Sequence, residues 1–242
     1  MNNLDKLQIA VLCGVLLTFT ACSSLSKNDV NAPSSSSSNS AATAPIFTAS
    51  NDPRADVEKA MRRRLEVKSY RMRNVLTMSD GYNTTTSYET VNPDRMHMTT
   101  EITVPGKGTG KREIIIIGKD AYRKTGDAPW EKDQYGMADA LEQLRDPKLI
   151  DAIAQKAEVK YLGTAMLDGA PMLTYQYTIK DLLGPGKDAV SKIWIGATDN
   201  LQHQVETEND YADPLNAGKI IHSKTTVTFF DYNADIKIEP PM

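Results

Sequence analysis

Hydrophobic positions recur at helical spacing in the first regularly patterned part of the chain. Between residues 53 and about 67, apolar side chains recur every four residues at Val57, Met61 and Leu65, with Ala60 beside them. This spacing predicts an amphipathic helix, and Pro53 occupies a position that a first helical turn tolerates. We therefore expect a helix with one apolar face at the start of the folded part.

From about Ser69 the apolar period changes to two, the period of a strand. On this first strand, one face is predicted to carry Tyr70, Met72, Leu76 and Met78. Further strands are predicted at 84–91, 96–104 and 112–117, followed by a short hairpin that carries Tyr122 and Trp130. Turns are predicted at Asp80-Gly81 and over the glycine-rich residues 105–110.

The middle of the chain returns to helical spacing. A first helix is marked by Met137, Ala140, Leu141 and Leu144. A second, after Pro147, is marked by Leu149, Ile150, Ile153, Ala154 and Ala157. Each helix has one apolar stripe, so each is expected to pack against another element.

The remainder is again rich in strands, at 159–167, 171–179, 191–195, 201–209 and 220–232. Turns are predicted at Asp168-Gly169 and Asp199-Asn200. About ten strands joined mostly by hairpin-length turns predict an α+β fold with one large antiparallel sheet. A sheet of this size twists and curls, and one of its faces has to be covered by other elements. The middle helices are available to cover it.

The chain begins with a targeting signal. Residues 1–21 contain an apolar stretch that is too short to span a membrane but has the length of a signal-peptide core. The segment Phe19-Thr20-Ala21-Cys22 resembles the bacterial lipoprotein box, which implies cleavage before Cys22 and acylation of that cysteine. The alternatives are a plain signal peptide or an uncleaved anchor. Residues 22–50 contain 10 serines and are predicted to be a flexible tether, which leaves 51–242 as one folded domain.

Charge and cysteine content exclude several classes of function. The chain has 28 Lys and Arg against 31 Asp and Glu, a net charge of -3, which disfavours binding to nucleic acid through a bulk positive field. Its two cysteines are Cys13 and Cys22, so the folded domain has neither a disulfide nor a thiolate site. Residues 106–111 and 184–188 lack the pattern of a phosphate-binding loop and are interpreted as turns.

Polar residues suggest two weaker possibilities for ion binding. His97, His203 and His222 lie far apart in the sequence and do not predict a metal site, and no cofactor is expected. A set of acidic residues forms either a weak cation site or a solvated edge: Glu206, Glu208, Asp210 and Asp213. A basic set around the first helix forms either a solvated face or a surface attracted to anionic headgroups: Lys59, Arg62, Arg63, Arg64, Lys68, Arg71 and Arg73.

Several stretches resemble the LolA/LolB and LppX/LprG type of bacterial lipoprotein: Asn92 to Met96, Glu113 to Tyr122 with Trp130, Lys192 to Ile195 followed by Leu201 to Gln204, and Phe230 to Asn233 with Pro240-Pro241. The resemblance covers roughly residues 54–241. It implies an unclosed, strongly curved half-barrel whose helices cover the concave face, with a hydrophobic cavity for acyl chains between them.

The side chains expected to line this cavity come from the first and third strands and from the middle helices: Met72, Leu76, Met78, Met96, Met98, Ile102, Leu141, Leu144, Ile150 and Ile153. Methionine suits an irregular or fluid apolar ligand, but the same residues can instead fill an ordinary packed core. Both interpretations remain open at the level of sequence.

The resulting functional hypothesis is a non-catalytic envelope lipoprotein that binds or transfers a lipid or a lipoprotein acyl group. We expect a monomer, held on the membrane through Cys22, on the outer membrane facing the periplasm or the cell surface rather than on the inner membrane. The alternative is a structural lipoprotein with a filled core that recruits a protein or glycan partner.

Overall fold

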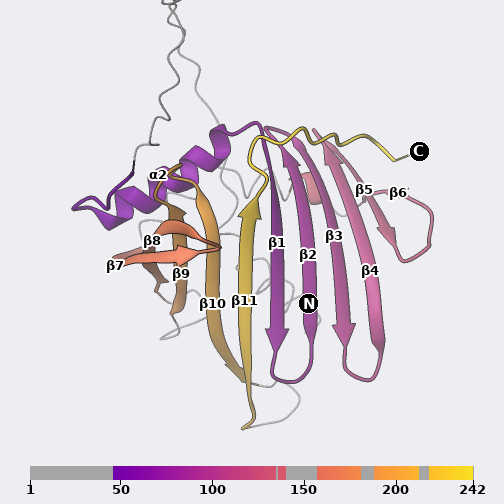
Figure 1. Ribbon diagram of the computed structural model, residues 1–242. Coiled ribbons are helices and arrows are strands. Elements are labelled where there is room, and N and C mark those ends of the chain that lie inside the picture. Colours follow the sequence, from indigo (N-terminus) through magenta and orange to yellow (C-terminus); the bar gives the residue numbers. More distant parts are fainter. Residues whose placement is uncertain (1–45, 135, 140–156, 181–187, 213–217, 242) are drawn as a thin grey trace, which may run out of the picture.

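A computed structural model describes residues 46–134, 136–139, 157–180, 188–212 and 218–241 (Figure 1). Helix α2 spans Pro53–Glu66. The strands are β1 Ser69–Met78, β2 Asn83–Val91, β3 Arg95–Val104, β4 Gly108–Ile117, β5 Asp120–Thr125, β6 Glu131–Lys132, β7 Ala157–Leu167, β8 Ala170–Ile179, β9 Ala189–Gly196, β10 Gln202–Ala212 and β11 Ile220–Phe230.

All eleven strands form one antiparallel sheet in the order β6-β5-β4-β3-β2-β1-β11-β10-β9-β8-β7. In this order every strand pairs with strands adjacent to it in sequence, with one exception. The exception is the long-range pairing of β1 with β11. β6 and β7 lie at the two edges, so the sheet is not closed. In Figure 1 strand β7 lies across the direction of β1 to β4, which shows how strongly the sheet is curved. The predicted unclosed antiparallel half-barrel is confirmed.

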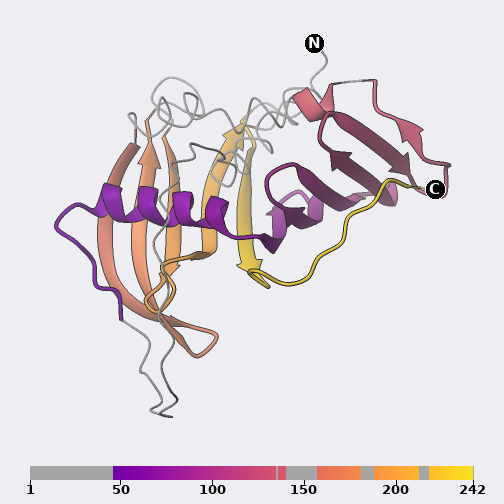
Figure 2. The same ribbon diagram turned by 90° about the horizontal axis from the view of Figure 1, so that it is seen from above.

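Helix α2 begins where the sequence provides a cap. The Asp52 side chain accepts hydrogen bonds from the backbone N–H groups of Arg54 and Ala55, both at 3.1 Å, and Pro53 follows in the first turn. The helix lies across β7 to β10 (Figure 2). Tyr175 on β8 donates a hydrogen bond of 2.9 Å to the Asp56 carboxylate and so fixes the helix to the sheet.

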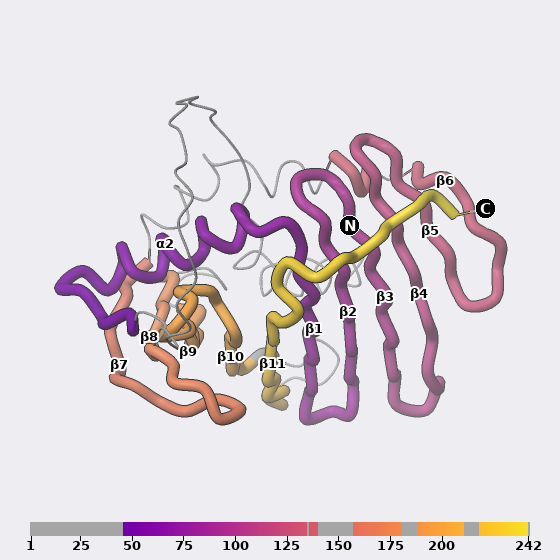
Figure 3. Tube along the Cα trace, turned by 45° about the horizontal axis from the view of Figure 1, so that its top comes forward, coloured from indigo at the N-terminus to yellow at the C-terminus, as the bar shows by residue number. Residues whose placement is uncertain are grey.

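The two faces of the sheet are covered by different elements. We call the face that packs against α2 the helix-side face; its buried residues include Tyr70, Met72, Tyr175, Ile193 and Phe229. The opposite, tail-side face carries the alternate residues. There Ile115 packs against Ile236 and Ile238 of the C-terminal segment, which crosses β1 to β4 (Figure 3). Both ends of the domain therefore help to cover the sheet.

Two sequence-based boundaries were wrong. Residues 108–110 belong to β4 and not to a turn, because Gly108 and Gly110 pair with Val104 and Ile102 of β3, and this cross-strand pairing outweighs the weak strand preference of glycine. Ala157 begins β7 and does not end a helix. Ala157 is 1% exposed, and a buried alanine fits both the end of a helix and the start of a strand. Periodicity alone therefore did not distinguish the two.

The rest of the predicted middle helices, at 140–156, lies outside the described residues, as do the predicted signal peptide and most of the predicted tether. Just before that gap, Met137 and Ala138 pack against the helix-side core. Among the described helices, none has the length and apolarity needed to cross a membrane.

Candidate functional site

A row of large apolar side chains crosses five neighbouring strands on the helix-side face. The strand registers place them directly opposite one another, in the order Phe229, Met72, Tyr88, Met98 and Ile114. We call this the Phe229 row. It spans four inter-strand spacings, roughly 19 Å at about 4.8 Å each. Four of its members are buried and Met98 is half-buried, so the row forms a continuous apolar strip across the sheet.

A parallel row contains Tyr70, Thr90, Met96 and Ile116, all four buried and all apolar except Thr90. We call this row and the Phe229 row the apolar rows. On the other side of the Phe229 row the character of the face changes. There Asn74, Thr86 and Thr100 stand opposite one another, and the hydroxyls of Thr86 and Thr100 are 3.2 Å apart. The strongly apolar part of the helix-side face is therefore bounded by a polar row.

Six of the predicted lining residues lie on the helix-side face: Met72, Leu76, Met78, Met96, Met98 and Ile102. Met72 and Met96 are each 2% exposed. The polar row separates Leu76 and Ile102 from the methionines of the two apolar rows, which the sequence pattern did not reveal. That these residues line a cavity stays a prediction. The other predicted positions, Leu141, Leu144, Ile150, Ile153 and the acylation site Cys22, lie outside the described residues.

Where α2 ends, it buries a charged side chain against the apolar rows. Arg64 is 0% exposed, and its guanidinium carbon lies 4.8 Å from the ring centre of Phe229 and 5.8 Å from that of Tyr70. Its Nη1 donates to the side-chain oxygen of Gln202 at 3.2 Å. The interpretation of Arg64 as part of a solvated basic face is wrong. Arg62 and Arg63 are exposed, but Arg64 points into the sheet.

Apart from the Gln202 side chain, the polar groups around Arg64 form hydrogen bonds with one another and not with its guanidinium. Tyr232 donates a hydrogen bond to the backbone oxygen of Gln202, and burial raises the pKa of this phenol. Asp199 lies 2.9 Å from His203 Nε2. Burial alone raises the pKa of Asp199, but the hydrogen bonds from His203 and from the Leu201 N–H outweigh burial, so the net shift of this pKa is downward.

The Asp199–His203 pair depends on a glycine. A Cβ atom at Gly196 would lie 2.2 Å from Asp199 Oδ1 and 2.9 Å from His203 Nε2. Arg63 Nε also donates to the backbone oxygen of Asp199 at 2.8 Å. The turn between β9 and β10 is therefore closely fitted to the end of α2.

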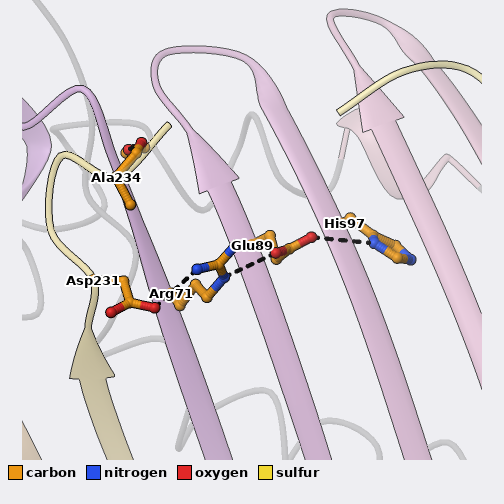
Figure 4. A network of polar contacts seen from close by, with 6 residues as sticks. Arg71, Glu89, His97, Asp231 and Ala234 are labelled. Carbon is orange, nitrogen blue, oxygen red and sulfur yellow. Dashed lines mark hydrogen bonds and ion pairs between the residues drawn. The ribbon is translucent and has the colours of Figure 1, made fainter. Parts of the chain in front are cut away.

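The tail-side face carries a second polar group, in which the charges are paired. Arg71 donates to Glu89 at 2.9 Å and to Asp231 at 2.8 Å (Figure 4). His97 lies 3.7 Å from Glu89 and 3.5 Å from Glu113. We call these five residues the tail-side ladder. A hydrogen bond from Lys111 is the main cause of the lowered pKa of Glu113.

Most of the other acidic and histidine residues singled out by the sequence have partners on neighbouring strands. Lys224 lies 3.7 Å from Glu206 and 3.3 Å from Glu208, and His222 lies 2.6 Å from Asp210. Asp213 lies outside the described residues. Within the part of the chain that the structure describes, no group of three His, Cys, Asp or Glu side chains is arranged to hold a metal ion. The described members of this set therefore pair with neighbouring polar side chains along the strands.

Comparison with known proteins places this arrangement in a known fold. The lipoprotein LppX of Mycobacterium tuberculosis superposes with a TM-score of 0.51 at 12% identity, covering 77% of this chain and 97% of LppX. LprF of Mycobacterium bovis superposes with a TM-score of 0.52 at 14% identity, covering 82% of this chain and 99% of LprF. The chain has the fold of these two proteins. The likeness confirms the LppX type of fold that the strand stretches suggested.

A LolA-superfamily protein of Nitrosomonas europaea is less similar, with a TM-score of 0.27 at 12% identity, which is too low to support an argument. No protein-family model matches the chain. No curated protein matches its sequence.

Proposed function

We propose that this protein is an envelope lipoprotein that binds an amphiphilic lipid or an acyl group on its helix-side face, without covalent chemistry. The observation that carries the proposal is the Phe229 row, an apolar strip across five strands of an open sheet. Its span, roughly 19 Å, is similar to the length of an extended fatty acyl chain. Met72 and Met98 give the strip side chains that adapt to irregular apolar ligands.

The burial of the strip sets the condition for binding. Phe229 and Met72 are 1% and 2% exposed, so a ligand reaches them only when the groups that cover them move aside. The apolar area that a ligand covers contributes about 25 cal/mol per Å², the same as the contacts it replaces. Binding therefore replaces the protein groups that cover the strip by the ligand. It is a population shift between a protein-covered and a ligand-covered state.

A lipid-retention experiment tests the proposal. A chain beginning at Ile46, where the described structure starts, is expressed in a bacterial host and examined by native mass spectrometry and by organic extraction. We expect co-purifying lipid at a substantial fraction of one molecule per chain. Lipid-free protein that also fails to take up fatty acid or lysophospholipid from solution would refute the proposal.

Membrane attachment through Cys22, on an outer membrane facing the periplasm or cell surface, is the second part of the proposal. It is supported by the segment Phe19-Thr20-Ala21-Cys22 and by the serine-rich residues that follow. The lipoprotein box implies a diacylglycerol on the Cys22 sulfur and an acyl group on its new amine, and these three chains exceed the number needed for stable anchoring. Metabolic labelling with a palmitate analogue tests it, since the full chain should incorporate label and Cys22→Ser should not. Label that persists in Cys22→Ser would exclude this residue as the acylation site.

One observation favours the alternative, a scaffold that recruits a protein. Edge strand β7 exposes Tyr161, Leu162 and Met166, the last at 66%, and in the described sheet it pairs only with β8. An exposed, partly apolar edge accepts an added strand from a partner. If the protein proves lipid-free in the retention experiment, this edge becomes the leading candidate site.

A further inference from the structure

The buried charge beneath α2 has hydrogen-bonding capacity that the described residues leave unused. Arg64 Nε and Nη2 and the side-chain nitrogen of Gln202 are buried and have no hydrogen-bond partner among the residues that the structure describes. The bond from Arg64 Nη1 to Gln202 Oε1 brings these groups together at one place. All three unused groups are donors. Arg64 also makes no ion pair with a carboxylate in the described part of the chain, and the nearby Asp199 carboxylate is bonded to His203 and to the Leu201 N–H.

Such an arrangement is costly unless an acceptor completes it. A buried donor without a partner keeps its full desolvation penalty, and an unpaired buried charge costs more. The faces of Phe229 and Tyr70 offset part of this cost, since a guanidinium over an aromatic ring is attracted by the ring. They supply no oxygen, however, and a set that contains only donors is suited to carboxylate or phosphate oxygens.

The position of these donors relative to the apolar rows suggests the rest of the ligand. Arg64 lies over Phe229, the first member of the Phe229 row, and over Tyr70, the first member of the parallel row. A molecule whose anionic end met the guanidinium would have its chain directed toward Met72 and the strands beyond. Polar and apolar ends of one amphiphile would then each meet matching protein groups.

We infer that Arg64 and Gln202 form the headgroup site for an anionic amphiphile, whose carboxylate or phosphate they bind and whose chain lies along the Phe229 row. The inference rests on the proposed function and specifies the chemical class of the ligand. It also assigns a role to a charge that the packing of α2 alone does not require.

The test compares matched ligands that differ only in the anionic group. Binding of oleate is compared with oleyl alcohol, and binding of oleoyl lysophosphatidate with mono-oleoylglycerol, by equilibrium partition onto the delipidated full chain. Inorganic phosphate alone serves as the free-anion competitor. We expect at least one anionic ligand to bind tenfold or more tightly than its neutral counterpart. Millimolar phosphate should not displace it.

Variants assign this preference to the proposed donors. Arg64→Met should remove the preference for the anionic member of the pair and leave binding of the neutral member within twofold of wild type. Arg71→Met, on the tail-side face, should leave the preference unchanged. Arg64→Lys should retain only part of it, because an ammonium keeps the charge but lacks the fork of donors.

A substitution at the neighbouring residue keeps the inference testable if the Arg64 variants fold poorly. Gln202→Glu places a carboxylate where Arg64 Nη1 already donates, so it supplies an internal anion. It should abolish the preference for anionic ligands while raising the melting temperature of the ligand-free protein. Gln204→Glu, on the same strand but hydrogen-bonded to Glu206, is the control and should do neither.

The outcomes separate this inference from the proposed function. Equal binding of the anionic and neutral members of both pairs would overturn the headgroup site and leave lipid binding intact. No binding of either member would overturn both. Displacement by phosphate alone would assign the site to a free anion and overturn the amphiphile. An unchanged preference in both Arg64→Met and Gln202→Glu would place the recognition elsewhere and would also overturn the inference.

Discussion

Arg64 and Arg71 are close in sequence, but they lie on opposite faces of the sheet in opposite electrostatic surroundings. Arg71 is partly exposed and bonded to two carboxylates, Glu89 and Asp231. Arg64 is fully buried against two aromatic rings and bonded to an amide oxygen. The charge of Arg71 is satisfied by carboxylates and solvent without any ligand. Arg64, in contrast, keeps N–H donors that have no acceptor among the described residues. The comparison shows that burial together with unused hydrogen bonds, and not charge by itself, identifies a candidate ligand site.

The largest difference between these two regions should appear at their neighbouring phenylalanines. Phe229, under Arg64, is 1% exposed, while Phe230, paired in register with Arg71, is 40% exposed. Phe229→Ala should lower the free energy of unfolding by about 3 to 5 kcal/mol because it opens a cavity in the core. Phe230→Ala should change it by less than about 1 kcal/mol. Urea unfolding followed by circular dichroism measures both, and equal losses would contradict the assignment of the two faces.

The C-terminal segment on the tail side provides the next effect. Ile238 is buried beside Ile115, and Arg95 donates a hydrogen bond of 2.8 Å to its backbone oxygen. Ile238→Ala should lower the free energy of unfolding by about 2 to 3 kcal/mol, at the lower end for a buried isoleucine because the cluster is small. The exposed neighbour Lys237→Ala is the control. A loss below about 0.5 kcal/mol for Ile238→Ala would show that the segment does not cover this face in solution.

The two arginines should respond in opposite directions when the charge is removed. In delipidated protein, Arg64→Met should raise the free energy of unfolding by about 1 to 2 kcal/mol, since methionine fills part of the space without burying a charge. Arg71→Met should instead lower it slightly, since this change removes a partly exposed ion pair that solvent screens. Urea titration of both variants checks this. A loss of more than about 2 kcal/mol for Arg64→Met would show that its charge is compensated in the ligand-free protein.

The smallest effect concerns pH and the tail-side ladder. The hydrogen bond from Lys111 lowers the pKa of Glu113, so its ionised form stabilises the folded state above the unfolded pKa. This contribution is lost as the pH falls through the folded pKa. The stability advantage of wild type over Glu113→Gln should therefore shrink between about pH 5 and pH 3, by less than about 1 kcal/mol. The exposed Glu101→Gln is the control, and an advantage that grows on acidification would contradict the sign.

Local periodicity was sufficient for much of the fold. The alternation of Met72, Leu76 and Met78 placed these residues on one face, and the pairing of β1 with β2 and β11 agrees with that. The strand period is a property of the backbone, so it is readable wherever one face is buried. The same reasoning identified α2 and its start near Pro53.

Arg64 illustrates where sequence reasoning failed and which signal was present. The predicted apolar stripe of the helix was Val57, Met61 and Leu65 with Ala60 beside them, but the buried residues are Val57, Ala60 and Arg64. Those three share one helix face by spacing as well. Arg64 was grouped with Arg62 and Arg63 because arginine is seldom fully buried, so its residue type outweighed its position.

The sequence by itself therefore determined α2, most of the strands with their two faces, and the antiparallel sheet, because these depend on neighbours along the chain. The tertiary structure alone decided which side chains meet. The long-range pairing of β1 with β11 brings Tyr70 beside Phe229, and α2 then sets Arg64 over both rings and against Gln202. Residues so far apart in sequence leave no local pattern, since their contact exists only after the sheet has formed.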